Sequence, residues 1–227
     1  MKEKTKKEKR SYAKRDASEF NFWRGLFYAI VTKVFYMIRL KVIYRLKVYG
    51  KGNIPKNNKF VVAANHLSTL DPPLVGAVMP RPVSFMAKQE LFDIKFVRWW
   101  LDWLGAFAVN RDHLGASTIK TAKSVCQTDW LLGLFPQGTR CAPGIISNIN
   151  KGFASIAKAT KCGILPVGIT GTEKATHIPF SGNIVVKIGE LIPYNENVDE
   201  MVSQWIKAIE ELTGFKYMDS QELENAK

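Results

Sequence analysis

Short, continuous apolar runs alternate with helix-like stretches from residue 41 onward, and this alternation restricts the fold more than any other feature of the chain. Runs such as Phe60–Ala64 (FVVAA) and Ile164–Thr170 (ILPVGIT) contain no charged residue. Strands of this kind are buried on both faces, as in parallel sheets that helices cover. The pattern therefore predicts a three-layer α/β domain with a mixed, largely parallel sheet.

The apolar runs define seven predicted strands, at Lys41–Tyr49, Phe60–Ala64, Val83–Ala87, Ala106–Val109, Trp130–Phe135, Ile164–Thr170 and Ile184–Ile188. Helices are predicted at Pro73–Met79, Ile94–Leu104, Gly115–Thr128, Gly152–Thr160 and Val198–Leu212. The last of these stops just before Gly214, as helices commonly do. We expect one catalytic domain over residues 48–215 and a polar C-terminal tail over 216–227.

Positive charge is concentrated at the N-terminus. The net charge is +13, yet residues 1–51 hold 15 Lys and Arg against 4 Asp and Glu, whereas residues 52–227 hold 18 against 16. A basic segment implies an anionic partner, either nucleic acid or anionic lipid. Residues 1–19 are polar and strongly basic, which predicts a disordered tail.

Residues 20–47 are dense in aromatic and aliphatic side chains, but Lys33 and Arg39 interrupt them. A spanning helix needs about 20 consecutive apolar residues, so we expect an interfacial, membrane-associated helix instead. Its Lys and Arg side chains would snorkel toward the interface. A helix packed on the protein's own core is the alternative. The rest of the chain lacks a nucleic-acid recognition motif, so anionic membrane lipids are the expected partner and nucleic acid is not.

The three cysteines, Cys126, Cys141 and Cys162, show neither disulfide nor zinc-ligand spacing. There is also no Walker loop and no nucleophile elbow. We therefore expect no metal and no bound cofactor, and direct general-base chemistry on an anionic substrate.

His66 follows the predicted strand Phe60–Ala64, and ligand sites in open α/β folds form at the ends of strands. Asp71 comes five residues later, and the Pro-Pro after it suggests a turn that folds the carboxylate back to the imidazole. A carboxylate on one ring nitrogen fixes the tautomer and leaves the other nitrogen as a base. The alternative for Asp71 is a turn or helix-capping residue.

Two further strand ends carry arginine. GAFAVNRD delivers Arg111, and LGLFPQGTR delivers Gly138, Thr139 and Arg140. Backbone amides, a hydroxyl and a guanidinium suit a phosphate group. The alternatives are a surface salt bridge for Arg111 and a tight turn with a surface arginine for Arg140. Pro166 interrupts another apolar strand and predicts an edge or bulge that shapes a groove wall.

In combination, these blocks resemble the glycerophospholipid acyltransferase family over about residues 45–190. NHLSTLD (65–71) resembles the family's NH-x4-D block, GAFAVNRD its second block, FPQGTR (135–140) its FPEGTR block, and ILPVGI its fourth block. AKQELF (87–92) resembles a stretch found between the first two. Gln137 departs from the pattern, because the family usually has Glu there. Gln keeps hydrogen-bonding capacity but lacks the charge, which puts the acceptor in doubt more than the reaction class.

The resemblance implies transfer of a fatty acyl group from acyl-CoA or acyl-ACP to 1-acyl-sn-glycerol-3-phosphate, which gives phosphatidic acid. His66 is the implied general base and Asp71 orients it. Arg111 and Arg140 are the expected phosphate clamp, with Lys88 as a third cation.

Asn65, Gln137 and Pro166 are further site candidates, and backbone amides around Gly138 are candidates for holding the oxyanion. Peripheral or monotopic association with the cytoplasmic face of a membrane is expected. Acylation of glycerol-3-phosphate or a lysophospholipid, and a non-catalytic lipid-binding role, are the alternative functions.

Overall fold

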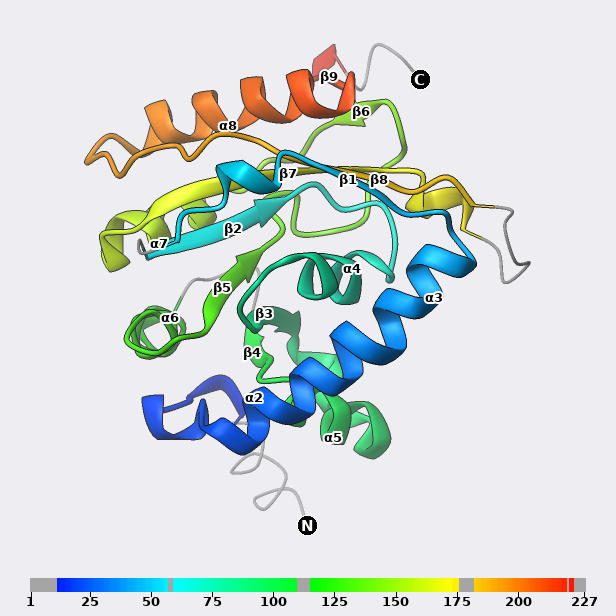
Figure 1. Cartoon of the computed structure of the whole chain (residues 1–227). Helices are drawn as coiled ribbons and strands as arrows, with labels where there is room; N and C mark the ends of the chain where they lie inside the picture. Colours follow the sequence, from blue (N-terminus) through cyan, green and yellow to red (C-terminus); the bar gives the residue numbers. More distant parts are fainter. Residues whose placement is uncertain (1–11, 57–58, 110–114, 176–181, 220, 223–227) are drawn as a thin grey trace.

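A seven-stranded sheet with the strand order β1-β8-β7-β2-β5-β3-β4 runs through the molecule (Figure 1). The computed structural model describes residues 12–56, 59–109, 115–175, 182–219 and 221–222. The strands of the sheet are β1 (Lys47–Tyr49), β2 (Phe60–Ala64), β3 (Val83–Lys88), β4 (Phe107–Val109), β5 (Leu131–Leu134), β7 (Gly163–Thr170) and β8 (Val185–Ile188). A second, two-stranded sheet pairs β6 (Ile145–Ile146) with β9 (Lys216–Tyr217).

All pairings in the large sheet are parallel except one. The exception is β7 with β8, so β8 and its neighbour β1 run opposite to the other five strands. β2 and β5, at the centre, are buried along their whole length. The mixed, largely parallel sheet predicted from the continuous apolar runs is thereby confirmed.

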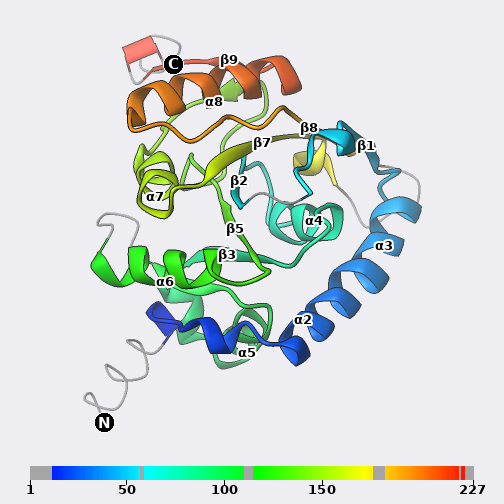
Figure 2. The ribbon, with the colours of Figure 1, turned by 60° about the vertical axis from the view of Figure 1, so that its left-hand side comes forward.

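Helices cover both faces of the sheet (Figures 1 and 2). One face carries α6 (Ala116–Cys126), α7 (Gly152–Thr160) and α8 (Val198–Thr213), which pack on β5, β2 and β7. The other face carries α4 (Asp71–Val78), with a long N-terminal helix lying over it. α5 (Lys95–Trp103) packs beside the start of that helix. The layers agree with the predicted α/β architecture.

The N-terminal helix is continuous and consists of α2 (Phe22–Ala29), a π-helical stretch (Ile30–Tyr36) and α3 (Met37–Val42). The side chain of Asn21 caps its first turn by accepting the N–H of Arg24. In the described part of the chain, no helix is both long enough and apolar enough to cross a bilayer.

Lys33 fastens this helix to the C-terminal end of α4. Its ammonium donates to the carbonyl of Ala77 at 2.6 Å and to that of Met79, where the negative end of the helix dipole favours a cation. Burial lowers the pKa of Lys33 to about 8. Gly76 allows the close packing, because a Cβ there would stand 2.2 Å from the hydroxyl oxygen of Tyr28. The expectation that Lys33 snorkels toward a membrane interface is therefore wrong.

Residues 12–19 pack against the domain, so the prediction of a disordered tail is wrong for this part of it. Arg15 is 1% exposed and forms ion pairs with Glu19 at 2.9 Å and with Asp102 at 2.6 Å. A basic, polar composition predicts a solvent-exposed arginine. Arg15 can be buried because the carboxylates of Glu19 and Asp102 neutralise its charge. Residues 1–11 of the predicted tail lie outside the described residues.

Two other predicted boundaries differ from the structure. The strand predicted at Lys41–Tyr49 begins only at Lys47, because the N-terminal helix continues through Val42. The tail predicted from residue 216 starts with β9, whose residues pair with β6. The backbone hydrogen bonds decide both cases. Lys41 and Val42 form theirs within the N-terminal helix, and Lys216 and Tyr217 form theirs with β6.

Candidate active site

β2 brings His66 to the edge of the sheet where the central strands end. The residue before it, Asn65, is held across to β7: its Nδ2 donates to the carbonyl of Ile169 at 2.9 Å, and its Oδ1 accepts the N–H of Ile169 at 2.7 Å. From the α8 side, the indole of Trp205 donates to the carbonyl of Ala63 at 3.0 Å. β7 and α8 therefore both hold the end of β2, from which His66 projects. The amide of Asn65 is committed to the fold and not directed at a ligand.

Asp71 is the first residue of α4 and folds back onto His66. Its Oδ2 lies 2.8 Å from Nδ1 of His66 and also accepts the N–H groups of Leu67 at 2.6 Å and Ser68 at 2.7 Å. The Asp71 side chain is fully buried, and that of His66 is 13% exposed. The fold-back expected from the HLSTLD spacing is present.

The contact between His66 and Asp71 sets the protonation pattern of the imidazole. A carboxylate that accepts two amide N–H groups acts as an acceptor toward the ring as well. Nδ1 of His66 therefore carries the proton, and the lone pair of Nε2 is left to receive one. This arrangement, with Nε2 turned away from the buried carboxylate, is the one that a general base requires.

Residues 137–141 form a loop that is bonded at both ends to the backbone of His66; we call it the arch. The side-chain Oε1 of Gln137 accepts the N–H of His66 at 2.8 Å, and the N–H of Cys141 donates to the carbonyl of His66 at 2.9 Å. Between these contacts Gly138 adopts φ +66°, a conformation that other residues enter at a cost. The middle of the arch, Thr139 and Arg140, is exposed beside His66.

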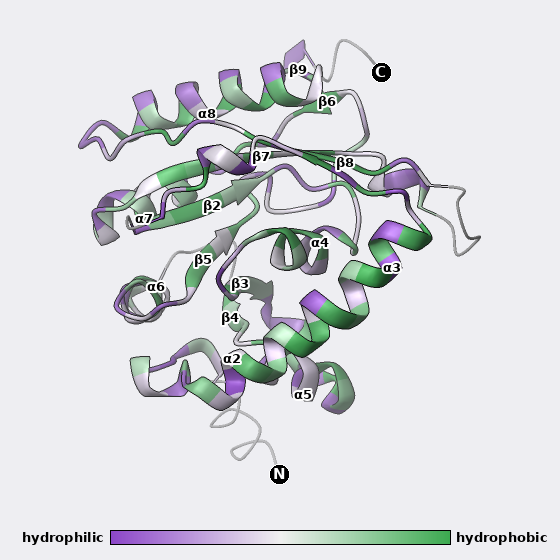
Figure 3. Ribbon diagram, viewed as in Figure 1, coloured by the Kyte–Doolittle hydropathy of each residue, from purple (hydrophilic) through white to green (hydrophobic). Residues whose placement is uncertain are grey.

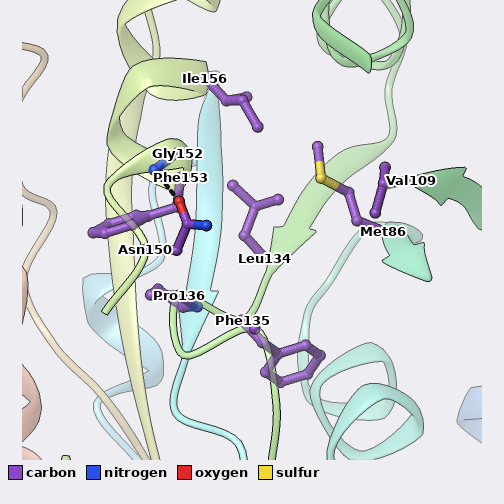
Figure 4. Close-up of a pocket in the computed structure, with 10 residues that line it drawn as sticks. Met86, Val109, Leu134, Phe135, Pro136, Asn150, Gly152, Phe153 and Ile156 are labelled. Atoms are coloured by element: carbon purple, nitrogen blue, oxygen red, sulfur yellow. Dashed lines mark hydrogen bonds between the residues drawn. The ribbon is translucent and has the colours of Figure 1, made fainter. Parts of the chain in front are cut away.

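Phe135 joins the turn from His66 to Asp71 to an apolar pocket. Its ring stacks on the imidazole of His66, with 4.2 Å between centroids and 22° between planes. The same residue lines a pocket of about 90 Å³ between the sheet and α7, together with Met86, Val109, Leu134, Pro136, Gly138, Asn150, Gly152, Phe153 and Ile156. Figure 4 shows the side chains of Met86, Leu134 and Ile156 converging on this space. An apolar group bound there would end next to the base.

Residues 45–170, more than half of the chain, match the model of a protein family described as acyltransferase. The chain belongs to the acyltransferase family. A protein from Bacillus subtilis named 1-acyl-sn-glycerol-3-phosphate acyltransferase is 33% identical over 156 residues, which are 66% of this chain and 77% of that protein. A protein of the same name from Streptococcus pneumoniae is 30% identical over 149 residues, 64% of this chain and 55% of that protein.

A crystal structure from Thermotoga maritima has a similar fold. It is the 1-acyl-sn-glycerophosphate (LPA) acyltransferase PlsC, which aligns with a TM-score of 0.57 and 27% sequence identity. The alignment covers 74% of this chain and 72% of that one. Together with the family match, this places the His66–Asp71 pair on an acyltransferase fold.

Gln137 stands where the acyltransferase family usually has Glu. From the sequence, Gln137 was a further site candidate that keeps hydrogen-bonding capacity without the charge. In the structure it is 4% exposed, and its Oε1 accepts the backbone N–H of His66. An uncharged amide and a carboxylate can both accept that N–H, so this contact does not require the charge of Glu.

The structure brings some of the expected phosphate ligands to the base and not others. Thr139 and Arg140 lie on the arch, but the amide of Gly138 is committed, since it donates to the carbonyl of Phe135 at 2.9 Å. Lys88 is exposed at the end of β3 and lies 3.5 Å from the carboxylate of Glu90. Arg111 lies outside the described residues.

Pro166 lies on β7, between β8 and β2, so the expectation of an edge strand is wrong. Its carbonyl accepts the N–H of Gly189 at 3.0 Å, just beyond the end of β8 at Ile188. The carbonyl and the nitrogen of one strand residue point to the same side, so the missing N–H faces Gly189, just past the last residue of β8. A central strand therefore tolerates this proline.

Except for Gly138, the pocket residues, Phe135 included, were not singled out from the sequence. Phe135 belongs to the FPQGTR block, so the motif contained it, but an aromatic residue at a strand end is equally typical of a core. Met86, Leu134 and Ile156 carry no signal of their own, because apolar residues on buried elements are expected everywhere in such a domain.

Proposed function

We propose that this acyltransferase moves a fatty acyl group from a thioester donor to the free hydroxyl of 1-acyl-sn-glycerol-3-phosphate, which gives phosphatidic acid. The observation that carries the proposal is the 2.8 Å contact between Nδ1 of His66 and buried Asp71, which leaves Nε2 as a base. The names of the similar proteins from Bacillus subtilis and Thermotoga maritima support this choice of acceptor.

In the proposed reaction, Nε2 of His66 takes the proton of the acceptor hydroxyl while that oxygen bonds to the thioester carbonyl carbon. Asp71 stabilises the imidazolium that forms. The carbon–sulfur bond of the tetrahedral intermediate then breaks, and the departing sulfur takes the proton from the imidazolium. No acyl-enzyme is formed, because the acceptor oxygen itself attacks the acyl carbon.

We place the acceptor's phosphate at the arch. In the described part of the chain, the backbone amides of Thr139 and Arg140 donate to no protein acceptor, and the guanidinium of Arg140 is exposed beside them. Two amides and a guanidinium match the oxygens of a phosphate. Arg111 and Lys88 stay in the proposal as further cations of the clamp.

The apolar pocket is the proposed place for part of a fatty acyl chain. Its lining is mostly apolar, with Asn150 as a polar member, and Phe135 borders both the pocket and the imidazole of His66. A chain bound there places its carbonyl carbon near the base. The donor is proposed to be acyl-CoA or acyl-ACP, since either presents the same thioester.

The N-terminal helix supports membrane association. The face turned away from α4 exposes Phe22, Trp23, Leu26, Ile30, Val34, Phe35, Ile38 and Val42. Most of these recur every four residues, which places them in one row along the helix. The row has the aromatic and aliphatic composition of an interfacial helix (Figure 3). Residues 1–47 carry four acids and many cations, which favours an anionic leaflet and peripheral or monotopic attachment on the cytoplasmic face.

The decisive experiment incubates the purified full chain with labelled acyl-CoA and, separately, with labelled acyl-ACP. Each donor is offered 1-acyl-sn-glycerol-3-phosphate, glycerol-3-phosphate and a lysophospholipid that has a bulky headgroup. We expect label in phosphatidic acid, with a much smaller yield from the other two acceptors. Equal or higher yield from another acceptor overturns the proposed substrate, and no transfer to any acceptor overturns the proposed activity.

The matched inactive variant is Asp71→Asn, in which a nearly isosteric amide replaces the buried carboxylate. We expect it to lose most of the transfer while binding the acceptor as the wild type does, because an amide provides no negative charge for the imidazolium. Transfer at the wild-type rate would exclude the His66–Asp71 pair as the source of activity.

A further inference from the structure

Exposed apolar side chains gather on two helices that touch each other. Thirteen of the fifteen large hydrophobic residues that are exposed in the described part of the chain lie on the N-terminal helix or on α5 and the turn before it. We call this set the aromatic surface; its members are Phe22, Trp23, Leu26, Ile30, Val34, Phe35, Ile38, Val42, Leu91, Ile94, Phe96, Trp99 and Trp103. Exposed apolar patches of this extent mark an interaction site.

Ring contacts make the two parts of the aromatic surface continuous. Phe27 of α2 lies 6.0 Å from Trp99, 5.7 Å from Trp100 and 5.3 Å from Trp103, measured between ring centroids. The two helices also lie side by side in Figures 1 and 3. α5 therefore extends the exposed row of the N-terminal helix sideways.

The charges of the N-terminal helix point to an anionic partner for the aromatic surface. Residues 20–47 contain six Lys or Arg residues and no acid. The α5 segment is balanced, because exposed Asp93 just before it offsets exposed Lys95. Asp102 of α5 is turned to Arg15 at 2.6 Å and Arg24 at 3.6 Å. Apolar and aromatic bulk beside a cationic helix is the chemistry of a surface that lies in an anionic lipid interface.

A second copy of the chain fits this surface less well. In a two-fold dimer the same patch meets itself, so the cations of the N-terminal helix would face a surface of the same sign. Like charges across an interface oppose association, whereas a leaflet that contains anionic lipid supplies the complementary charge.

We propose that α5, with Leu91 and Ile94 just before it, is a second lipid-binding element that enters the same leaflet as the N-terminal helix. This rests on the proposed membrane association of that helix and extends it to a segment in the middle of the catalytic domain. The acyltransferase domain then contacts the bilayer through two elements that are far apart in sequence, Phe22–Val42 and Leu91–Trp103, which fixes its orientation on the membrane.

The test is sedimentation of the full chain with vesicles of phosphatidylcholine, with and without phosphatidylglycerol. The variant is Ile94→Ser with Phe96→Ser, which removes side chains that are 55% and 71% exposed. We expect its partition onto phosphatidylglycerol vesicles to fall about tenfold, from the lost transfer of two apolar side chains into lipid. Binding equal to that of the wild type overturns the proposal.

The matched control is Tyr49→Ser with Tyr217→Ser, the two exposed large hydrophobic residues that lie outside the aromatic surface in the described part of the chain. We expect this control to bind vesicles within about twofold of the wild type, since neither side chain is directed to the leaflet. An equal loss in both variants would show that any exposed aromatic residue affects sedimentation, and would overturn the assignment to α5.

A second measurement does not depend on polar substitutions. Trp99→Phe with Trp103→Phe keeps the packing nearly intact and removes two fluorophores of α5. If these rings enter the leaflet, quenching of tryptophan fluorescence by brominated lipid is weaker in this variant than in the wild type. Unchanged fractional quenching contradicts the proposal.

Two further readouts separate this proposal from its alternatives. Acyl transfer to a short-chain lysophosphatidic acid, dissolved as monomers, is expected to be the same in the α5 variant and the wild type. Absence of transfer in the wild type counts against the proposed function only. Sedimentation velocity without lipid is expected to give a monomer for both; a wild-type dimer that the α5 variant dissociates would assign the surface to self-association and overturn the proposal.

Discussion

The two loops that form the site are held in opposite ways. In the turn from His66 to Asp71, the carboxylate oxygen Oδ2 serves the imidazole and two backbone amides at once. In the arch, only the ends are bonded to His66, and Thr139 and Arg140 between them are exposed. The proposed base is thus held in one orientation, whereas the arch keeps the donors that we assign to the acceptor's phosphate. Changes in the turn should lower kcat, and changes in the middle of the arch should raise KM.

The largest expected effect is that of His66→Ala. Loss of a general base lowers the rate by about 10²–10⁴-fold, so kcat should fall by that amount with little change in the KM for the acceptor. Steady-state kinetics and a thermal unfolding curve check this together. A folded variant with wild-type kcat would show that the base lies elsewhere. The turn from His66 to Asp71 would then have no special role compared with the arch.

Gln137→Leu tests whether the arch positions the base. The substitution leaves the N–H of His66 without its acceptor, and loss of such a partner costs about 1–3 kcal/mol. We expect roughly tenfold lower kcat and an unchanged KM. Gln137→Glu is the control, because its carboxylate still accepts the N–H, and its kcat should stay close to that of the wild type. If both variants lose activity equally, the amide nitrogen of Gln137 matters, and not its oxygen.

Arg140→Ala should raise KM and leave kcat nearly unchanged, the opposite of the effect expected in the turn from His66 to Asp71. Removing a guanidinium that binds a phosphate costs about 1.5–3 kcal/mol, so KM for the phosphorylated acceptor should rise about tenfold or more while kcat changes little. Arg140→Lys keeps the charge without the planar guanidinium, so its KM should lie between that of the wild type and that of Arg140→Ala. A normal KM in Arg140→Ala would assign the phosphate to other cations.

The smallest expected effect concerns Lys33 and the pH dependence of stability. Burial lowers the pKa of Lys33 from 10.5 to about 8, so between these values the unfolded chain binds a proton that the folded chain has released. The free energy of unfolding should therefore rise with pH across this window. Lys33→Met should remove this rise, while Lys41→Met, on an exposed position of the same helix, should retain it. Denaturant titrations at pH 7.5 and 9.5 measure the difference, and identical pH dependence in both variants would contradict it.

Much of the sheet was predictable, since strands buried on both faces must be apolar throughout. Phe60–Ala64 is such a run, and its predicted bounds are those of β2. His66 and Asp71 were predictable as a pair because their spacing is short enough for a local turn to bring them together. These features depend on neighbours in sequence.

Contacts that depend on distant residues were not predictable in the same way. The acceptor role of Gln137 toward His66 joins positions 71 residues apart, and the burial of Arg15 requires Asp102, 87 residues away. α5 was recognised as a helix, but its alternation of apolar and polar residues did not reveal that one side stays exposed next to α2. Such features follow from the three-dimensional packing of elements, which local patterns do not encode.

The attachment of α4 at both of its ends has a consequence for how far the reaction lies from the lipid. The helix begins at Asp71, and its other end is bonded to Lys33 of the N-terminal helix. Eight residues of α-helix measure about 12 Å, so α4 is a rigid spacer between Lys33 of the N-terminal helix and the carboxylate of Asp71. With the N-terminal helix in a leaflet, as we propose, this spacer sets one fixed distance from that helix at which the acceptor hydroxyl has to meet His66.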